Sequence, residues 1–91
     1  MAKINKMDGD YAYVQVADAI QARIAKGEFT VRLPAERDLA SEYDVAYQTV
    51  RRSMKVLRER GLVITRQGRG TFVAPSARVT PEAEAQPEDG G

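Results

Sequence analysis

The chain has 91 residues, 43% of them hydrophobic, and a formal net charge of only +1, which indicates one small domain and leaves no room for a separate small-molecule effector domain. It contains no cysteine and no histidine, so disulfides, thiolate metal sites and the commonest general base are excluded. We therefore expect no metal site, no cofactor and no enzymatic activity. No stretch approaches the ~20 apolar residues of a membrane span, which favours a soluble cytoplasmic protein.

The first periodic segment predicts a helix. Apolar residues recur at three- and four-residue steps from Tyr13 to Ile24, so we expect a helix over residues 11–26. Asp10 can cap its start and Gly27 can close its end. The polar face of this helix shows no cluster of side chains that indicates a site, so we assign it to the scaffold.

Two more helices are expected before residue 61. After a possible short strand at Phe29, Val31 and Leu33, an acidic first turn predicts a second helix over residues 35–43, with an inward stripe at Leu39, Ala40 and Tyr43. A short turn at residues 44–46 precedes a third helix, from Ala46 or Tyr47 to Arg60, and this is the spacing of a helix-turn-helix. Its inward residues are Val50, Met54 and Leu57, and its outward cations are Arg51, Arg52, Lys55 and Arg58.

A β-hairpin is expected after the third helix. Residues 62–66 and 71–74 are rich in β-branched types, and two glycines between them permit the positive φ of a tight turn. The fold class is therefore mainly α with a small β wing: a winged helix-turn-helix of three helices and a two- to three-stranded antiparallel sheet. We expect a flexible arm at residues 1–9, the domain at residues 10–75 and a disordered acidic tail at residues 76–91.

The charge is concentrated on the third helix and the hairpin. Residues 48–75 carry seven arginines and lysines against one glutamate, or +6, whereas residues 11–47 sum to −2 and residues 76–91 to −3. A nearly neutral chain with such a polarised field favours a polyanionic partner, and double-stranded DNA is the polyanion that a helix-turn-helix contacts.

The run LPAERDLASEYDVAYQTVRRSMKVLRERGLVITRQGRGTFVA resembles the DNA-binding domain of GntR-type bacterial repressors. That family combines a leucine, proline, small residue, Glu, Arg motif with a helix-turn-helix and a Gln-Gly-x-Gly-Thr wing, and the resemblance covers residues 11–74. It implies a winged helix-turn-helix that acts as a homodimer on a two-fold operator.

Functional residues carry over from the family one position at a time. Arg37 and Arg51 match arginines that enter the major groove, Gln48 and Thr49 match positions that contact phosphate or base edges, and the hairpin tip matches a wing that enters the minor groove. Arg52 and Lys55 lie on the same helix face as Arg51. The full candidate set for DNA binding is Arg37, Tyr47, Gln48, Thr49, Arg51, Arg52, Lys55, Gln67, Gly68, Arg69 and Gly70.

One departure from the family pattern bears on specificity. Ala46 and Tyr47 stand where the family has Ser-Arg. The loss of a capping hydroxyl costs about 1 kcal/mol if nothing replaces it. An arginine that contacts bases becomes a tyrosine, which can stack on a sugar or contact a thymine methyl group, so we expect an operator unlike the family's usual one.

The sequence thus predicts a sequence-specific DNA-binding transcriptional regulator of bacterial type: a repressor that binds a short inverted repeat, with the recognition helix in the major groove and the wing in the minor groove. No long apolar seam is present for dimerisation, so we expect pairing to occur on DNA. The alternative is a winged-helix protein-interaction module whose basic helix meets an acidic partner.

Overall fold

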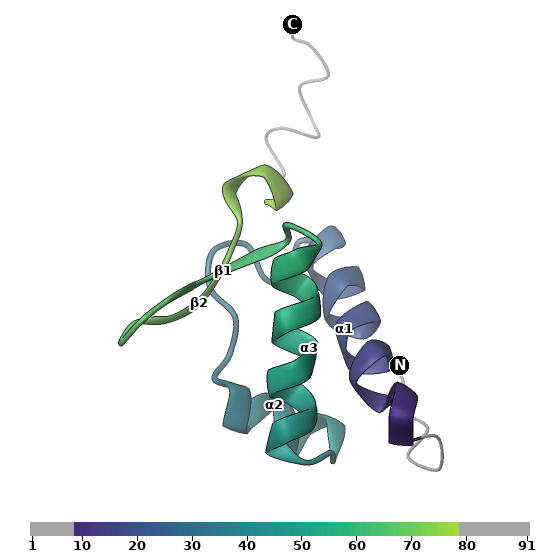
Figure 1. Ribbon diagram of the computed structural model, residues 1–91. Helices are drawn as coiled ribbons and strands as arrows, with labels where there is room; N and C mark the ends of the chain where they lie inside the picture. Colours follow the sequence, from purple (N-terminus) through teal and green to yellow (C-terminus); the bar gives the residue numbers. More distant parts are fainter. Residues whose placement is uncertain (1–8, 79–91) are drawn as a thin grey trace, which may run out of the picture.

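The computed structural model describes residues 9–78, which form three helices and a two-stranded antiparallel sheet (Figure 1). This confirms the winged helix-turn-helix architecture. In chain order the elements are α1 (Gly9–Ala25), α2 (Glu36–Tyr43), α3 (Tyr47–Glu59), β1 (Val63–Arg66), β2 (Gly70–Val73) and the 3₁₀ turn η1 (Pro75–Ala77).

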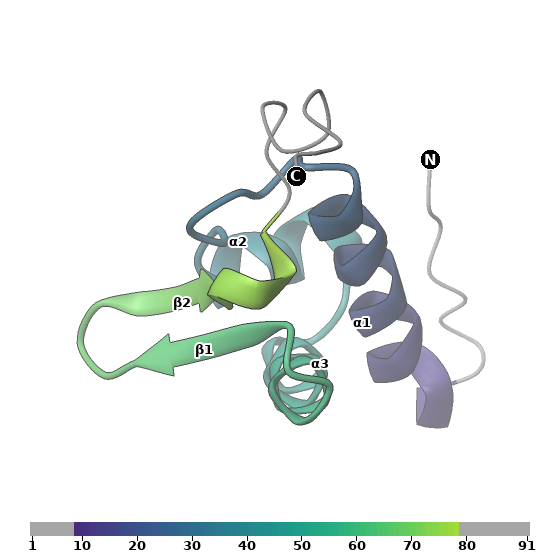
Figure 2. The same ribbon diagram turned by 90° about the horizontal axis from the view of Figure 1, so that it is seen from above.

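Helix α3 lies at the centre of the domain. In both views it stands between α1 on one side and the hairpin on the other, and α2 crosses beside its N-terminal half (Figures 1 and 2). Its predicted inward row is confirmed, because Val50, Met54 and Leu57 are all fully buried. The rest of the core comes from α1, α2 and the sheet, through Val16, Ala17, Ile20, Ile24, Leu39, Val63 and Val73.

The helix ends follow the backbone rules that the sequence indicates. Gly27 has φ 81°, and its N–H donates to the Ile24 carbonyl at 2.9 Å, which closes α1 as expected. Asp44 takes the left-handed conformation at the end of α2, with φ 55°. At the start of α3, Ala46 makes no side-chain capping bond, so the predicted loss of a capping hydroxyl is confirmed.

The boundaries of the first and last elements differ from the prediction. Helix α1 begins at Gly9, so Asp10 lies within the first turn and not at the N-cap. At the other end, Pro75 to Ala77 form η1, with Ala77 packed against the core, and Arg78 Nε donates to the Val73 carbonyl at 3.3 Å. Residues 76–78, which we assigned to the tail, therefore lie within the described structure, and Ala77 and Arg78 contact the domain. The remainder of the expected arm and tail, residues 1–8 and 79–91, lies outside the described residues.

The possible third strand is reduced to a single bridge. Arg32 pairs with Phe72, and two backbone bonds flank this bridge: Leu33 N–H donates to Thr71 O at 2.9 Å, and Val73 N–H donates to Val31 O at 2.8 Å. Pro34 has no N–H with which to extend the ladder. The sheet accordingly has two strands, and the connector between α1 and α2 is held along β2.

A polar cluster that the sequence did not predict holds the end of α1 against α2. Arg23 Nη2 donates to Glu28 Oε2 at 2.6 Å, and Arg23 Nη1 lies 2.8 Å from Glu42 Oε2 and 2.9 Å from the hydroxyl of Tyr43. The guanidinium also lies over the ring of Phe29 at 4.5 Å. The hydrogen bond from Arg23 holds the pKa of the Glu28 carboxyl below its ordinary value, and the same contact raises the pKa of Arg23.

This cluster predicts a difference in acid stability between wild type and Glu28→Gln. Because the folded-state pKa of Glu28 is depressed, its contribution is present above the unfolded-state pKa and is lost as the pH falls through the folded value. Urea unfolding should therefore show the wild type more stable than Glu28→Gln near neutral pH. The difference should shrink as the pH falls below the ordinary glutamate pKa of about 4.3 and disappear below the lower folded-state pKa. Glu59→Gln is the matched control, since Glu59 is exposed and makes no ion pair with the described residues. A Glu28→Gln difference that stays constant with pH would contradict the assignment.

Candidate nucleic-acid interface

The outward face of α3 carries the candidate residues that the sequence placed there. Burial of Val50, Met54 and Leu57 turns the opposite side of the helix towards solvent. On that side Tyr47, Gln48, Arg51, Arg52 and Lys55 are exposed, whereas Thr49 is only half exposed.

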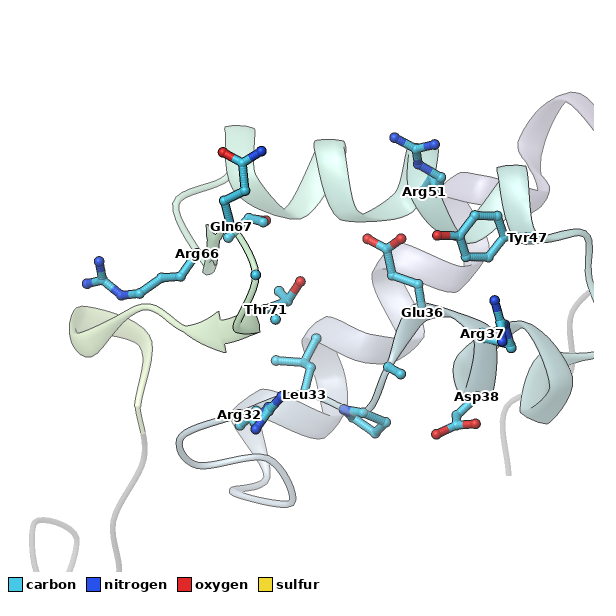
Figure 3. Close-up of a pocket in the computed structure, with 15 residues that line it drawn as sticks. Arg32, Leu33, Glu36, Arg37, Asp38, Tyr47, Arg51, Arg66, Gln67 and Thr71 are labelled. Carbon is cyan, nitrogen blue, oxygen red and sulfur yellow. The ribbon is translucent and has the colours of Figure 1, made fainter.

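An open cleft of about 820 Å³ lies between the start of α2, the start of α3 and the hairpin (Figure 3). Three segments that are distant in the chain therefore share one surface. The candidate residues that line it are Arg37, Tyr47, Arg51, Gln67, Gly68 and Gly70.

A second groove of about 550 Å³ runs along α3 and adjoins the first cleft. The two share Glu36, Tyr47, Arg51 and Thr65, so they form one continuous surface, which we call the basic face. The candidates Gln48, Arg52 and Lys55 line the second groove. Thr49 and Arg69 line neither hollow: Thr49 lies on the flank of α3, and Arg69 is exposed at the tip of the hairpin.

Some cations of α3 and its C-cap residue, Arg60, contact other parts of the fold. The guanidinium of Arg52 lies 3.9 Å from the centre of the Tyr13 ring, Arg58 Nη1 donates to Thr65 Oγ1 at 3.0 Å, and Arg60 Nη1 lies 2.9 Å from Asp18 Oδ1. Arg60 thus fastens α3 to α1, and Arg58 fastens α3 to the first strand of the hairpin.

Other cations of the basic face and the hairpin keep their donors available. The side chains of Arg37, Lys55, Arg66 and Arg69 make no ion pair or hydrogen bond with residues 9–78. Arg51 lies 5.9 Å from the centre of the Tyr47 ring and likewise makes no hydrogen bond in this part of the chain. These cations can be neutralised by a ligand without breaking a contact of the fold.

The hairpin has the glycine-dependent turn that the sequence predicts. Residues 67–69 connect the strands, and Arg69 N–H donates to Arg66 O at 2.9 Å. Gly68 has φ 78°, as the third residue of a type II turn requires, and Gly70 has φ 113°. Both positive φ values that were expected are confirmed.

Arg32 contacts the hairpin at Gly70. A Cβ atom at residue 70 would lie 3.1 Å from Arg32 Nη2, and the Arg32 guanidinium also lies 5.6 Å from the centre of the Phe72 ring. The absence of a side chain at Gly70 therefore allows the Arg32 side chain to lie against the start of β2, next to the turn.

Several residues of the basic face were not among the candidates chosen from the sequence. Arg32, Glu36, Thr65 and Arg66 line the larger cleft. Figure 3 shows Glu36 extending towards α3 beside Tyr47, among the arginines. The sequence motif Pro-Ala-Glu-Arg already contained Glu36, but an acidic residue at a helix start has an ordinary role in the helix dipole, so nothing marked it as part of the surface. Arg32 was not chosen because it lies in the connector, outside the helix-turn-helix and the hairpin motif.

Within residues 9–78 no three histidine, cysteine, aspartate or glutamate side chains are grouped so as to hold a metal ion. None of the helices in this part of the chain is both long and apolar enough to cross a membrane.

Comparison with known protein families shows to which family the chain belongs. The family described as "Bacterial regulatory proteins, gntR family" matches residues 12–73. The chain belongs to this gntR family. The family and its named members are transcriptional regulators and not enzymes, as the lack of histidine and cysteine led us to expect.

Individual relatives are similar over the same domain. The chain is 41% identical over 63 residues to the uncharacterized regulator YurK of Bacillus subtilis, and 34% identical over 73 residues to the repressor NagR of the same organism. These alignments cover 67% and 78% of this chain but only 26% and 30% of the relatives. The chain thus spans about a third or less of the length of these two regulators.

A solved structure shares both fold and sequence. The DNA-binding domain of AraR, in complex with an operator, matches with a TM-score of 0.65 and 34% sequence identity, covering 68% of this chain and 77% of the AraR chain. This likeness supports the winged helix-turn-helix assignment.

The contact of Arg32 with Gly70 predicts unequal costs for two glycine substitutions. Gly70→Ala should lower the free energy of unfolding by about 3 kcal/mol, because the new Cβ meets Arg32 at a backbone angle that alanine rarely adopts. Gly68→Ala should cost only about 1 kcal/mol, since its φ is also positive but no atom lies within 4 Å of the new Cβ. Urea unfolding measures both.

A double substitution isolates the contact. Gly70→Ala should cost less stability in the Arg32→Ala background than in the wild type, because the Arg32 atoms that the new Cβ meets are gone. Equal costs for Gly68→Ala and Gly70→Ala, or fully additive effects in the double variant, would contradict the proposed contact.

Proposed function

We propose that this chain is a sequence-specific DNA-binding repressor that recognises a short inverted-repeat operator, with α3 in the major groove and the hairpin in the minor groove. One observation carries the proposal. Cations that make no ion pair with residues 9–78, from the start of α2, the outer face of α3 and the hairpin, all border or flank the same basic face. Three separate elements with free positive charge on one surface suit a ligand that is long, grooved and anionic.

The position of Arg51 suits contact with bases. It lies on the second turn of α3, exposed and free of hydrogen bonds with the described residues, and the N-terminal part of a recognition helix is the part that contacts base edges. A planar guanidinium can bind guanine O6 and N7 together. Arg37 lies across the same cleft and can reach the same groove from α2.

The position of Arg69 suits the minor groove. The hairpin tip projects from the domain on the side away from α1 (Figures 1 and 2), and Arg69 is exposed there between two glycines. A narrow minor groove has an enhanced negative potential that attracts arginine. The glycines on either side leave room for the backbone to approach the sugar-phosphate chain.

The relatives support the same function. AraR, whose DNA-binding domain shares 34% identity with this chain, was solved in complex with an operator. NagR of Bacillus subtilis and MngR of Escherichia coli are both named repressors, with 34% and 40% identity. By this likeness we assign the same role to the present chain.

Two protomers are proposed to bind one operator. One recognition helix spans only a few base pairs, and a two-fold pair doubles the number of bases contacted. The large hydrophobic residues that are exposed in the described part of the chain lie in three separate places: Tyr11 on α1, Val31 in the connector and Tyr47 at the start of α3. They form no continuous seam, so pairing should depend on adjacent binding to DNA.

Binding-site selection tests both the readout and the pairing. Wild-type protein should select an inverted repeat with two related half-sites. Arg51→Ala should cost roughly 1 to 3 kcal/mol per half-site and relax the preference at one base pair, because a bidentate contact with guanine is lost. Lys55→Ala is the matched control: Lys55 is an exposed cation one turn further along α3, and its loss should weaken binding to all DNA without changing the motif.

Lys55 serves this purpose better than Arg58, because Arg58 also holds the hairpin through Thr65. If Arg51→Ala kept the wild-type motif, our orientation of α3 in the groove would be wrong. A single, non-repeated wild-type motif would instead contradict the paired arrangement.

Affinity should also fall steeply with salt. If about five cations per protomer neutralise phosphates, a plot of log affinity against log salt should have a slope of roughly −4 to −5 per protomer, owing to release of condensed counterions. Fluorescence anisotropy of a labelled operator between low and moderate salt measures the slope. A flat response would favour the alternative function, a protein-interaction module that uses the basic face for an acidic partner.

A further inference from the structure

The ring of Tyr47 is exposed on the basic face and does not pack on the hydrophobic core. It is 46% exposed at the first position of α3, and it is absent from the residues that pack on the hydrophobic core. It lines both the larger cleft and the groove along α3, so it occupies the seam where the two hollows meet. A large aromatic ring left in water at the centre of a basic surface points to a contact with the ligand.

Tyr47 and Arg51 form a pair on this surface. They are four residues apart, on the same side of the helix, and the Arg51 guanidinium carbon lies 5.9 Å from the ring centre, within the range of a cation–π contact (Figure 3). The ring leaves the hydrogen-bonding edge of the guanidinium free. The Tyr47 ring therefore restricts the position of the Arg51 guanidinium but does not occupy the N–H groups that would bind a base.

The geometry constrains what the ring can meet when Arg51 binds a base. Successive bases on one strand are about 3.4 Å apart along the duplex. The Tyr47 ring centre lies 5.9 Å from the Arg51 guanidinium carbon, which is more than one such step, so the ring is within reach of the neighbouring base pair when the guanidinium binds a guanine. The one apolar group that base pairs display in the major groove is the C5 methyl group of thymine.

We propose that Tyr47 and Arg51 act together on two adjacent base pairs, with Arg51 binding a guanine and the Tyr47 ring contacting the methyl group of a thymine in the next base pair. This rests on the proposed function, since it requires α3 to lie in the major groove. It makes Tyr47 a specificity-determining residue at the position where the gntR family resemblance led us to expect an arginine.

Replacement of single thymines by deoxyuridine tests the proposal, because uracil lacks only the methyl group. In the operator selected by the wild type, each thymine next to a guanine is changed in turn, in both half-sites. At one such position wild-type affinity should fall about threefold to fivefold, the effect of burying one methyl group. Tyr47→Phe keeps the ring and should show the same fall.

Tyr47→Ala should bind the thymine and uracil operators equally, and both more weakly than the wild type binds the thymine operator. Tyr11→Ala is the matched control, since Tyr11 is an exposed tyrosine on α1 and outside both hollows; it should keep the wild-type response to uracil. Circular dichroism melting curves establish that each variant is folded.

The outcomes distinguish a failure of the Tyr47 contact from a failure of the proposed function. If the wild type selects a motif but binds thymine and uracil operators equally at every position, or if Tyr47→Ala still discriminates between them, the pairing of Tyr47 with a thymine methyl group is wrong while DNA recognition stands. If the wild type selects no motif at all, both the proposed function and this inference are overturned.

Discussion

The structure depends on the division of α3 into two faces. One side must bury Val50, Met54 and Leu57 among residues from α1, α2 and the sheet, and this contact holds the domain together. Because the helix has 3.6 residues per turn, burial of that row fixes the direction in which every other side chain of α3 leaves the helix. The same packing that stabilises the core therefore sets the direction of every cation on the outer face, and loss of a core residue would disturb both.

A second constraint concerns the hairpin, which buries Val63 and Val73 in the core but exposes residues 65–70. Its first strand is fastened to α3 by the bond from Arg58 to Thr65, and its second strand is fastened to the connector by the Arg32 bridge and two backbone bonds. The angle between the recognition helix and the hairpin is thus set from both sides. If α3 and the hairpin contact two grooves at once, as the proposed function requires, that angle matters as much as the identity of any one contact residue.

The sequence was sufficient for elements whose signal is local. The apolar spacing in α3, the closing glycine after α1 and the glycine-dependent turn at Gly68 all depend on neighbouring residues, and each was found where expected. The fold class followed from these together with the family resemblance.

Features that depend on distant residues were not predictable in the same way. The cluster around Arg23 joins α1 to α2, and the stacking of Arg52 on Tyr13 joins α3 to α1, at separations that no local pattern reveals. In the candidate site, Arg32 and Glu36 enter the basic face only because the chain folds back. The buried hydroxyl of Ser53, 2.7 Å from the Tyr13 carbonyl, was likewise hidden in a helix pattern that otherwise predicts only apolar contacts.

The connector along β2 has a consequence for the solution behaviour of the chain. A two-stranded sheet has two open edges, each a potential template for sheet growth between molecules. Here the outward-facing Val73 N–H and Thr71 O of β2 are already bonded to the connector, so that edge cannot receive a strand from another molecule. The remaining edge belongs to β1, a strand of only four residues that ends in an arginine. A small domain that must display a projecting hairpin thereby avoids the self-association that an uncovered hairpin invites.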